Sequence, residues 1–87
     1  MRRAWVSSEA YEAAIAVVVA ARVDLGISQR ELASRLNKPR SFVSKYENRE
    51  RRLDILELMA IARALDADVL KLVAGIAANL PAEWRLG

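Results

Sequence analysis

The spacing of apolar and polar residues predicts helices along most of the chain. Apolar residues fill positions 13–21, and a capping Ser7 or Ser8 before them and Gly26 after them predict a first helix over about 8–25. No stretch alternates apolar and polar residues for long enough to predict a strand. The chain has only three glycines and two prolines, the residues that most often interrupt helices. The pattern therefore predicts an all-α fold.

Four further helices are predicted from capping and turn residues. Ser28 and Glu31 have the spacing of a capping box, in which the serine oxygen accepts an N–H and the glutamate bonds back. Asn37 suits a left-handed turn, and Pro39 suits the first turn of the next helix. The predicted helices span about 28–36, 39–48, 54–65 from an Asp54 cap, and 68–80 from an Asp68 cap to the stop at Pro81.

The apolar faces of these helices predict one shared core. The second helix is expected to bury Leu32, Ala33 and Leu36. The apolar side of the fourth helix, expected to face the core, carries Ile55, Leu58, Met59, Ala62 and Leu65. Five short helices joined by tight turns are typical of a compact orthogonal bundle, so residues 1–87 are predicted to form a single domain. The tail over 81–87 has no predicted element or role.

Composition narrows the range of functions. The chain has no cysteine and no histidine, which removes the commonest metal ligands and the commonest general base. We therefore expect neither a metal nor a cofactor, and an enzyme is disfavoured. The apolar run over 13–21 has nine residues, whereas a membrane span needs about 20. The basic Met1–Arg3 is followed by Glu9 and Glu12, unlike a signal peptide, so a soluble cytoplasmic protein without membrane contact is expected.

The excess positive charge is concentrated in one segment. Residues 38–52 contain six basic and two acidic side chains, a net charge of +4, whereas the whole chain carries +3. The remaining 72 residues therefore carry a net charge of −1, from eight basic and nine acidic side chains. Phe42, Val43 and Tyr46 lie between these charges. Such a segment favours a helix that packs on a core by one face and meets an anionic partner with the other.

Two short helices joined by the turn Leu36–Pro39 predict a helix-turn-helix over about 28–48. In the second of them, Val43, Tyr46 and Glu47 share one face by helical spacing. The opposite face carries Arg40, Ser41, Ser44, Lys45 and Asn48. Hydrogen-bond donors arranged in this way match the acceptor edges of guanine in the major groove of DNA.

The segment "ISQRELASRLNKPRSFVSKYENRERR", residues 27–52, resembles the lambda/Cro-type (XRE family) helix-turn-helix regulators. The resemblance extends over about 8–65. It implies a lambda-repressor-like bundle in which the helix over 39–48 enters the major groove of double-stranded DNA. The implied base contacts are Arg40, Ser41 and Lys45. The implied phosphate contacts begin with Gln29, Ser44 and Asn48, and Arg22 with Glu47 matches a buried ion pair between the first and third helices.

The loop after this helix departs from the family pattern. Family members often have glycine after the asparagine, where this chain has Arg49. A left-handed backbone at Arg49 would cost about 1 kcal/mol, so we expect either a different turn or the left-handed conformation at Asn48. The loop is strongly charged, and Arg49, Arg51 and Arg52 are predicted to contact phosphates. Phe42 has three interpretations: packing in the core, contact with a thymine methyl group or a sugar, or contact with a partner.

The first and fifth helices are more apolar than a small bundle requires. They could bury only each other, or they could also form a homodimer, which would match two DNA half-sites. The candidate dimer contacts on the fifth helix are Val69, Leu72, Val73, Ile76 and Leu80.

The sequence therefore predicts a sequence-specific DNA-binding transcription regulator, with a repressor favoured, that binds an inverted repeat as a dimer. Two alternatives stay open. One is an antitoxin that shares the DNA surface and binds a toxin protein. The other is a protein-interaction module with a helix-turn-helix fold, against which the basic surplus on residues 38–52 stands.

Overall fold

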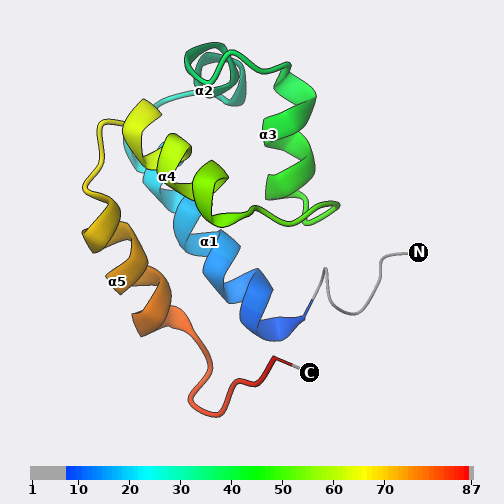
Figure 1. Cartoon of the computed structure of the whole chain (residues 1–87), viewed down its shortest axis with the longest axis vertical. Coiled ribbons are helices and arrows are strands. Elements are labelled where there is room, and N and C mark those ends of the chain that lie inside the picture. The colour runs from blue at the N-terminus through cyan, green and yellow to red at the C-terminus, as the bar shows by residue number, and fades with distance from the viewer. Residues whose placement is uncertain (1–7, 87) are drawn as a thin grey trace.

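The computed structural model describes residues 8–86 and contains five helices in this range (Figure 1). They are α1 (Glu9–Asp24), α2 (Gln29–Arg35), α3 (Arg40–Glu47), α4 (Ile55–Ala64) and α5 (Val69–Asn79). The predicted all-α fold is confirmed, since the described residues contain no strand. None of the helices described here has the length and apolar character needed to cross a membrane.

Side-chain caps set the helix starts. Ser8, Ser28, Asp54 and Asp68 each accept a backbone N–H at the first turn of α1, α2, α4 and α5, which satisfies donors that the helix itself leaves open. Ser7, the alternative cap for α1, lies outside the described residues. At α3 the cap position is Pro39, whose extended backbone leads into the helix without a side-chain bond.

The predicted capping box is only half right. Ser28 accepts the N–H of Glu31 at 3.0 Å, but the Glu31 carboxylate pairs with Arg35 one turn further on, at 3.0 Å. The complete box forms at α4, where the Asp54 side chain accepts the N–H of Glu57 and the Glu57 side chain accepts the N–H of Asp54. A nearby guanidinium thus attracts the Glu31 carboxylate more strongly than the neutral amide does.

The turns that join the five described helices use left-handed backbone at four residues. Asn37 has φ 56°, as expected for an asparagine in a tight turn, and Gly26 has φ 71° after α1. Asp66 has φ 56° between α4 and α5. Arg49 has φ 61°, while Asn48 keeps a negative φ of −84°. The expectation of a different turn or a left-handed Asn48 is therefore wrong. The arginine takes the conformation for which a glycine would be better suited, at a steric cost of about 1 kcal/mol.

The core is built from all five helices. The buried apolar side chains are Ile15, Val18, Leu32, Ala33, Val43, Tyr46, Ile61, Ala62, Leu65 and Leu72. The prediction for α4 is wrong at two positions: Ile55 is 78% exposed and Met59 is 48% exposed. The inward face of α4 is rotated relative to the predicted one, so that Ile61 is fully buried instead.

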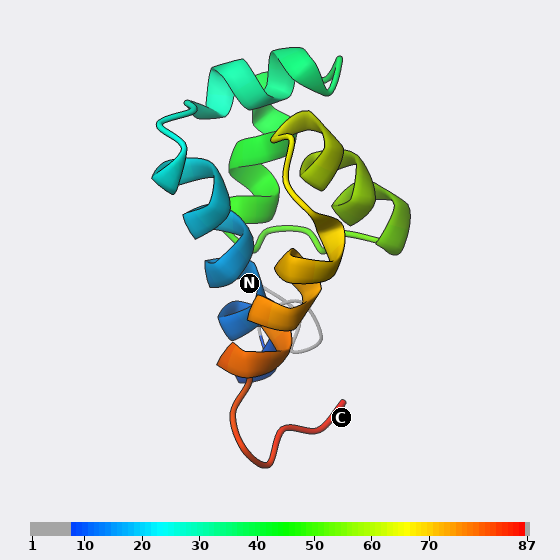
Figure 2. The same ribbon diagram turned by 90° about the vertical axis from the view of Figure 1, so that its left-hand side faces the viewer.

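Helices α1 and α5 pack side by side along their length (Figures 1 and 2). Gly75 permits this close approach, since a Cβ atom there would lie 3.3 Å from Val17 Cγ1. Asn79 adds a polar link by donating to the Ala13 carbonyl at 2.9 Å. Helices α2 and α3 lie at the opposite end of the molecule from the C-terminal tail (Figure 2).

Candidate nucleic-acid interface

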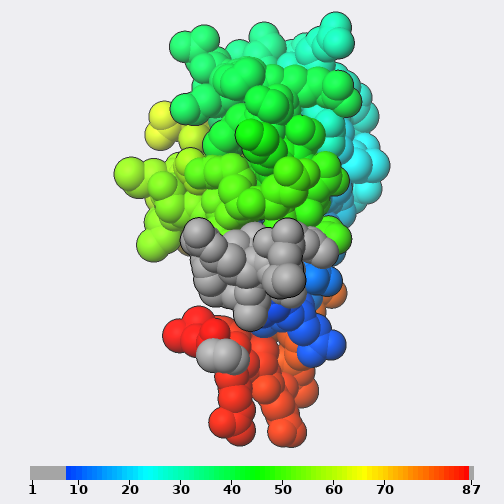
Figure 3. Space-filling view, turned by 90° about the vertical axis from the view of Figure 1, so that its right-hand side faces the viewer, coloured from blue at the N-terminus to red at the C-terminus, as the bar shows by residue number. Residues whose placement is uncertain are grey.

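Helix α3 presents a polar face to solvent because its other face is fixed in the core. Val43 and Tyr46 are fully buried, and Glu47 is 8% exposed. On the outward side Arg40, Ser41, Lys45 and Asn48 are exposed. Ser44 is half-buried, and its hydroxyl donates to the Ser41 carbonyl at 3.3 Å. In Figure 3, α3 and the segment after it form one continuous part of the molecular surface.

The turn between α2 and α3 is held by backbone hydrogen bonds. The Lys38 N–H donates to the Ala33 carbonyl at 2.9 Å, and the Asn37 N–H donates to the Ser34 carbonyl at 3.1 Å. Left-handed backbone at Asn37 makes this pattern possible. Because Leu32 and Ala33 of α2 are buried beside Val43 of α3, the two helices are held as one rigid unit.

A buried carboxylate joins three helices. Glu47 of α3 accepts from Arg22 of α1 through both oxygens, with Nε to Oε2 and Nη2 to Oε1 each at 2.8 Å. Gln29, the first residue of α2, donates its side-chain amide to Glu47 Oε1 at 2.9 Å. Arg22 also donates to the Ile27 carbonyl before α2. The bidentate bond to Glu47 raises the pKa of Arg22, so this arginine stays charged.

The arginines of the loop after α3 each contact another part of the chain. Arg51 makes two bonds of 3.0 Å to the Glu57 carboxylate, and its guanidinium lies 5.0 Å from the centre of the Phe42 ring. Arg52 lies 4.6 Å above the Tyr11 ring. Arg49 lies 3.9 Å from the Glu12 carboxylate. The bond from Arg51 keeps the pKa of Glu57 below its ordinary value, which fits a charged pair.

Three of these partners, Tyr11, Glu12 and Glu57, were not predicted from the sequence. Nothing in the spacing of residues 11 and 51 indicates that they meet, because the contact depends on how the loop crosses α1. Phe42 is also placed by the fold: it packs partly against the core, edge-on to Tyr46 at 5.7 Å, with Lys38 and Arg51 over its ring. The interpretation of Phe42 as a core residue therefore describes its observed position.

The candidate dimer contacts on α5 differ in how far the fold buries them. Leu72 is 7% exposed and belongs to the core of its own chain, so its prediction as a contact between chains is wrong. Val73 is 46% exposed, whereas Val69, Ile76 and Leu80 are half-buried. The surplus apolar surface includes α4 as well, with Ile55, Leu56 and Met59 exposed.

The fold and the polar face of α3 define a helix-turn-helix protein. A helix-turn-helix family model, HTH_3, matches residues 18–72. Among solved structures, an XRE-family like protein from Pseudomonas syringae pv. tomato strain DC3000 is 44% identical, with a TM-score of 0.75 over 83% of this chain and 88% of that chain. The clp gene regulator ClgR from C. glutamicum has the same fold, at 23% identity and a TM-score of 0.76. The match covers 88% of this chain and 100% of that chain. No curated protein matches the chain.

The chain belongs to the XRE family of helix-turn-helix proteins. This places it among DNA-binding transcription regulators, a class that is typically not enzymatic. Among residues 8–86 no cluster of acidic side chains has the composition of a metal site.

We predict that the Glu47 contacts stabilise the whole domain. Glu47→Ala should strand the Arg22 charge, whose side chain is 12% exposed, and lower the free energy of unfolding by about 3–5 kcal/mol. Thermal unfolding followed by circular dichroism should show a melting temperature lower by roughly 10 °C or more. Glu31→Ala is the control, because it removes an exposed ion pair with Arg35 that contributes about 1 kcal/mol or less. Equal melting temperatures for the two variants would contradict the prediction.

Proposed function

We propose that the chain represses transcription by placing α3 in the major groove of a specific operator. Arg40, Ser41 and Lys45 would contact base edges, with Arg40 suited to guanine through its paired donors. The observation that supports this most strongly is the exposure of these three side chains on a helix whose opposite face is fixed by buried contacts. A rigid helix keeps its donors in register with the bases and loses little conformational entropy on binding.

The contacts to the DNA backbone would come from residues around this helix. Gln29 donates one N–H to Glu47 and retains a second amide N–H for a phosphate oxygen. Asn48 is exposed and Ser44 half-exposed at the side of α3. Arg49 and Arg51 have side chains that are 36% and 37% exposed, and Arg52 follows them in the same loop. A guanidinium has five donors, so each of these arginines could keep its internal contact while it binds a phosphate.

We further infer a homodimer that binds an inverted repeat. One α3 reads only a few base pairs, and a two-fold dimer would double the contacts at half-sites about one helical turn apart. The apolar surface proposed for the dimer consists of Ile55, Leu56, Met59, Leu70 and Val73. Ile55 and Ile76 line one apolar groove of about 140 Å³ between α1, α4 and α5, so α4 and α5 contribute to the same face. Exposed apolar patches of this kind mark interaction surfaces.

Repression is the simplest outcome of such binding, since a dimer bound across a promoter excludes the polymerase from it. The place of action would be the cytoplasm of a bacterial or phage-infected cell, on the nucleoid. All of residues 1–87 would act as one DNA-binding domain.

The base contacts are tested by substitution with a charge-matched control. Lys45→Ala should relax the preference at one base pair of the selected site by about 1–3 kcal/mol, because it removes a contact that only the correct base satisfies. Lys71→Ala removes the same charge from an exposed position on α5, a helix that does not pack on α3, and should leave the preference unchanged. The site is first obtained by selection from random duplexes, and fluorescence anisotropy then gives the affinity for each single base-pair change. An unaltered preference in Lys45→Ala would show that Lys45 reads no base.

The dimer is tested by a second pair of variants. Val73→Arg should convert the dimer to a folded monomer in sedimentation, because a charge in an apolar contact has no partner. Val23→Arg is the control. It places the same charge near the C-terminal end of α1, at a valine that is 54% exposed, compared with 46% for Val73. That variant should remain dimeric. A wild-type chain that is monomeric in solution and protects a single half-site in a footprint would overturn the dimer.

A further inference from the structure

Helix α1 reaches the charged loop after α3 through one side chain. The Tyr11 hydroxyl accepts the Leu53 N–H at 3.0 Å and lies 3.4 Å from the Arg51 carbonyl, to which it donates. The Tyr11 ring lies beneath the Arg52 guanidinium at 4.6 Å. A single tyrosine thus contacts three consecutive residues, 51–53, that are 40 or more positions away in sequence.

The loop needs such contacts because it has no regular structure of its own. Residues 49–54 connect α3 to α4, starting from left-handed backbone at Arg49. Like charges lie close together at Arg49, Arg51 and Arg52, and they repel one another. Three contacts oppose this repulsion: the Tyr11 hydroxyl, the Glu57 carboxylate on Arg51 and the Glu12 carboxylate near Arg49. The Tyr11 hydroxyl bonds the loop backbone at both Arg51 and Leu53, whereas Glu57 bonds it at Asp54, the last residue of the loop.

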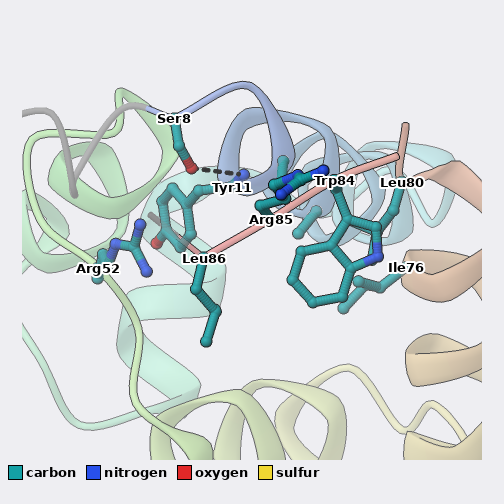
Figure 4. A pocket seen from close by; sticks show the side chains of 10 residues that line it. Ser8, Tyr11, Arg52, Ile76, Leu80, Trp84, Arg85 and Leu86 are labelled. Carbon is teal, nitrogen blue, oxygen red and sulfur yellow. Dashed lines mark hydrogen bonds between the residues drawn. The ribbon is translucent and has the colours of Figure 1, made fainter. Parts of the chain in front are cut away.

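The hydroxyl acts at this position in its neutral form, since it must donate and accept at once. Burial raises the pKa of Tyr11 above its ordinary value, although the Leu53 N–H and the nearby arginines oppose the shift. Figure 4 shows Tyr11 beside Arg52 at the wall of a pocket of about 210 Å³, which Trp84, Arg85 and Leu86 of the C-terminal tail also line. The tyrosine is therefore flanked by the loop on one side and by the tail on the other.

We propose that Tyr11 is a positioning residue for DNA binding: its hydroxyl fixes the backbone of the loop so that Arg49, Arg51 and Arg52 face the phosphates together. This inference rests on the proposed function. It assigns a role in DNA binding to α1, which contributes no residue to the recognition surface itself. Sequence preference would stay with α3, and the loop would contribute affinity that is independent of sequence.

The test uses the full chain with two tyrosine-to-phenylalanine variants. Tyr11→Phe keeps the ring beneath Arg52 and removes both hydrogen bonds. Tyr46→Phe is the matched control, because the Tyr46 hydroxyl is buried without a hydrogen-bond partner in the described structure. Anisotropy with the selected operator and with an unrelated duplex, at several salt concentrations, gives affinity and salt slope. Hydrogen exchange at the Leu53 amide reports on the loop directly.

Tyr11→Phe should bind both duplexes about five- to tenfold more weakly and lower the salt slope by roughly 0.9 for each phosphate that the loop no longer binds. The ratio between the two duplexes should stay unchanged, and the Leu53 amide should exchange faster. Tyr46→Phe should match the wild type in binding and in Leu53 exchange. A tyrosine that only stabilised the fold would lower the melting temperature without changing the salt slope.

Each other result has a distinct meaning. Wild-type affinity and salt slope in Tyr11→Phe would overturn the role of Tyr11 and leave the proposed function standing. A weakening confined to the operator would also overturn it, since the hydroxyl would then act on the base-reading helix. A wild-type chain that binds neither duplex would overturn the proposed function together with this inference.

Discussion

The helix-turn-helix geometry depends on how the Glu47 carboxylate is satisfied in the interior. A carboxylate that is 6% exposed in its side chain is costly to bury unless it is both neutralised and hydrogen-bonded. Arg22 supplies charge and two bonds, and Gln29 supplies a third. These donors come from α1 and from the start of α2, so the requirement is met only when both helices are docked against α3. The same contacts therefore set the orientation of α3 relative to the rest of the bundle.

The placement of charge follows from this arrangement. Apolar residues and Glu47 occupy the inner face of α3, and the basic and hydroxyl side chains can lie only on the outer one. The loop that follows adds three arginines, and each of them contacts another side chain. Arg51 pairs with Glu57, Arg52 lies over the Tyr11 ring, and Arg49 lies near Glu12. The two kinds of contact that we propose with DNA would thereby be separated in space, with bases read by the rigid helix and phosphates bound by the loop.

The helices were predictable because their signals are local. Serine and aspartate caps, Asn37 in the turn and the stop before Pro81 depend on neighbours within a few residues, and the structure agrees with them. The exposure of Ile55 was not predictable, since it depends on how α4 is rotated against α2 and α5. The burial of Leu72 was not predictable either, since it depends on which face of α5 packs against α1. The Tyr11 contacts join residues 40 or more positions apart, a distance over which spacing along the chain carries no information.

The resemblance to a known family, which extends over about 8–65, predicted the partners Arg22 and Glu47, which composition could not have done. It gave no guidance on Arg51, because the family pattern differs from this chain just before that residue. The structure places Arg51 on Glu57 and Phe42, and its contact with phosphate stays a proposal.

Mapping backbone amide shifts by NMR as the selected duplex is added tests the DNA-binding surface most directly. The arrangement of α3 and its loop predicts the largest changes at Gln29, over residues 40–48 and in the loop 49–54. Small changes are expected at the amides of Ala16 and Ala20, which line a groove beside Gly75 of α5. Changes concentrated on α1 and α5, with residues 40–48 unaffected, would show that α3 is not the DNA-binding helix.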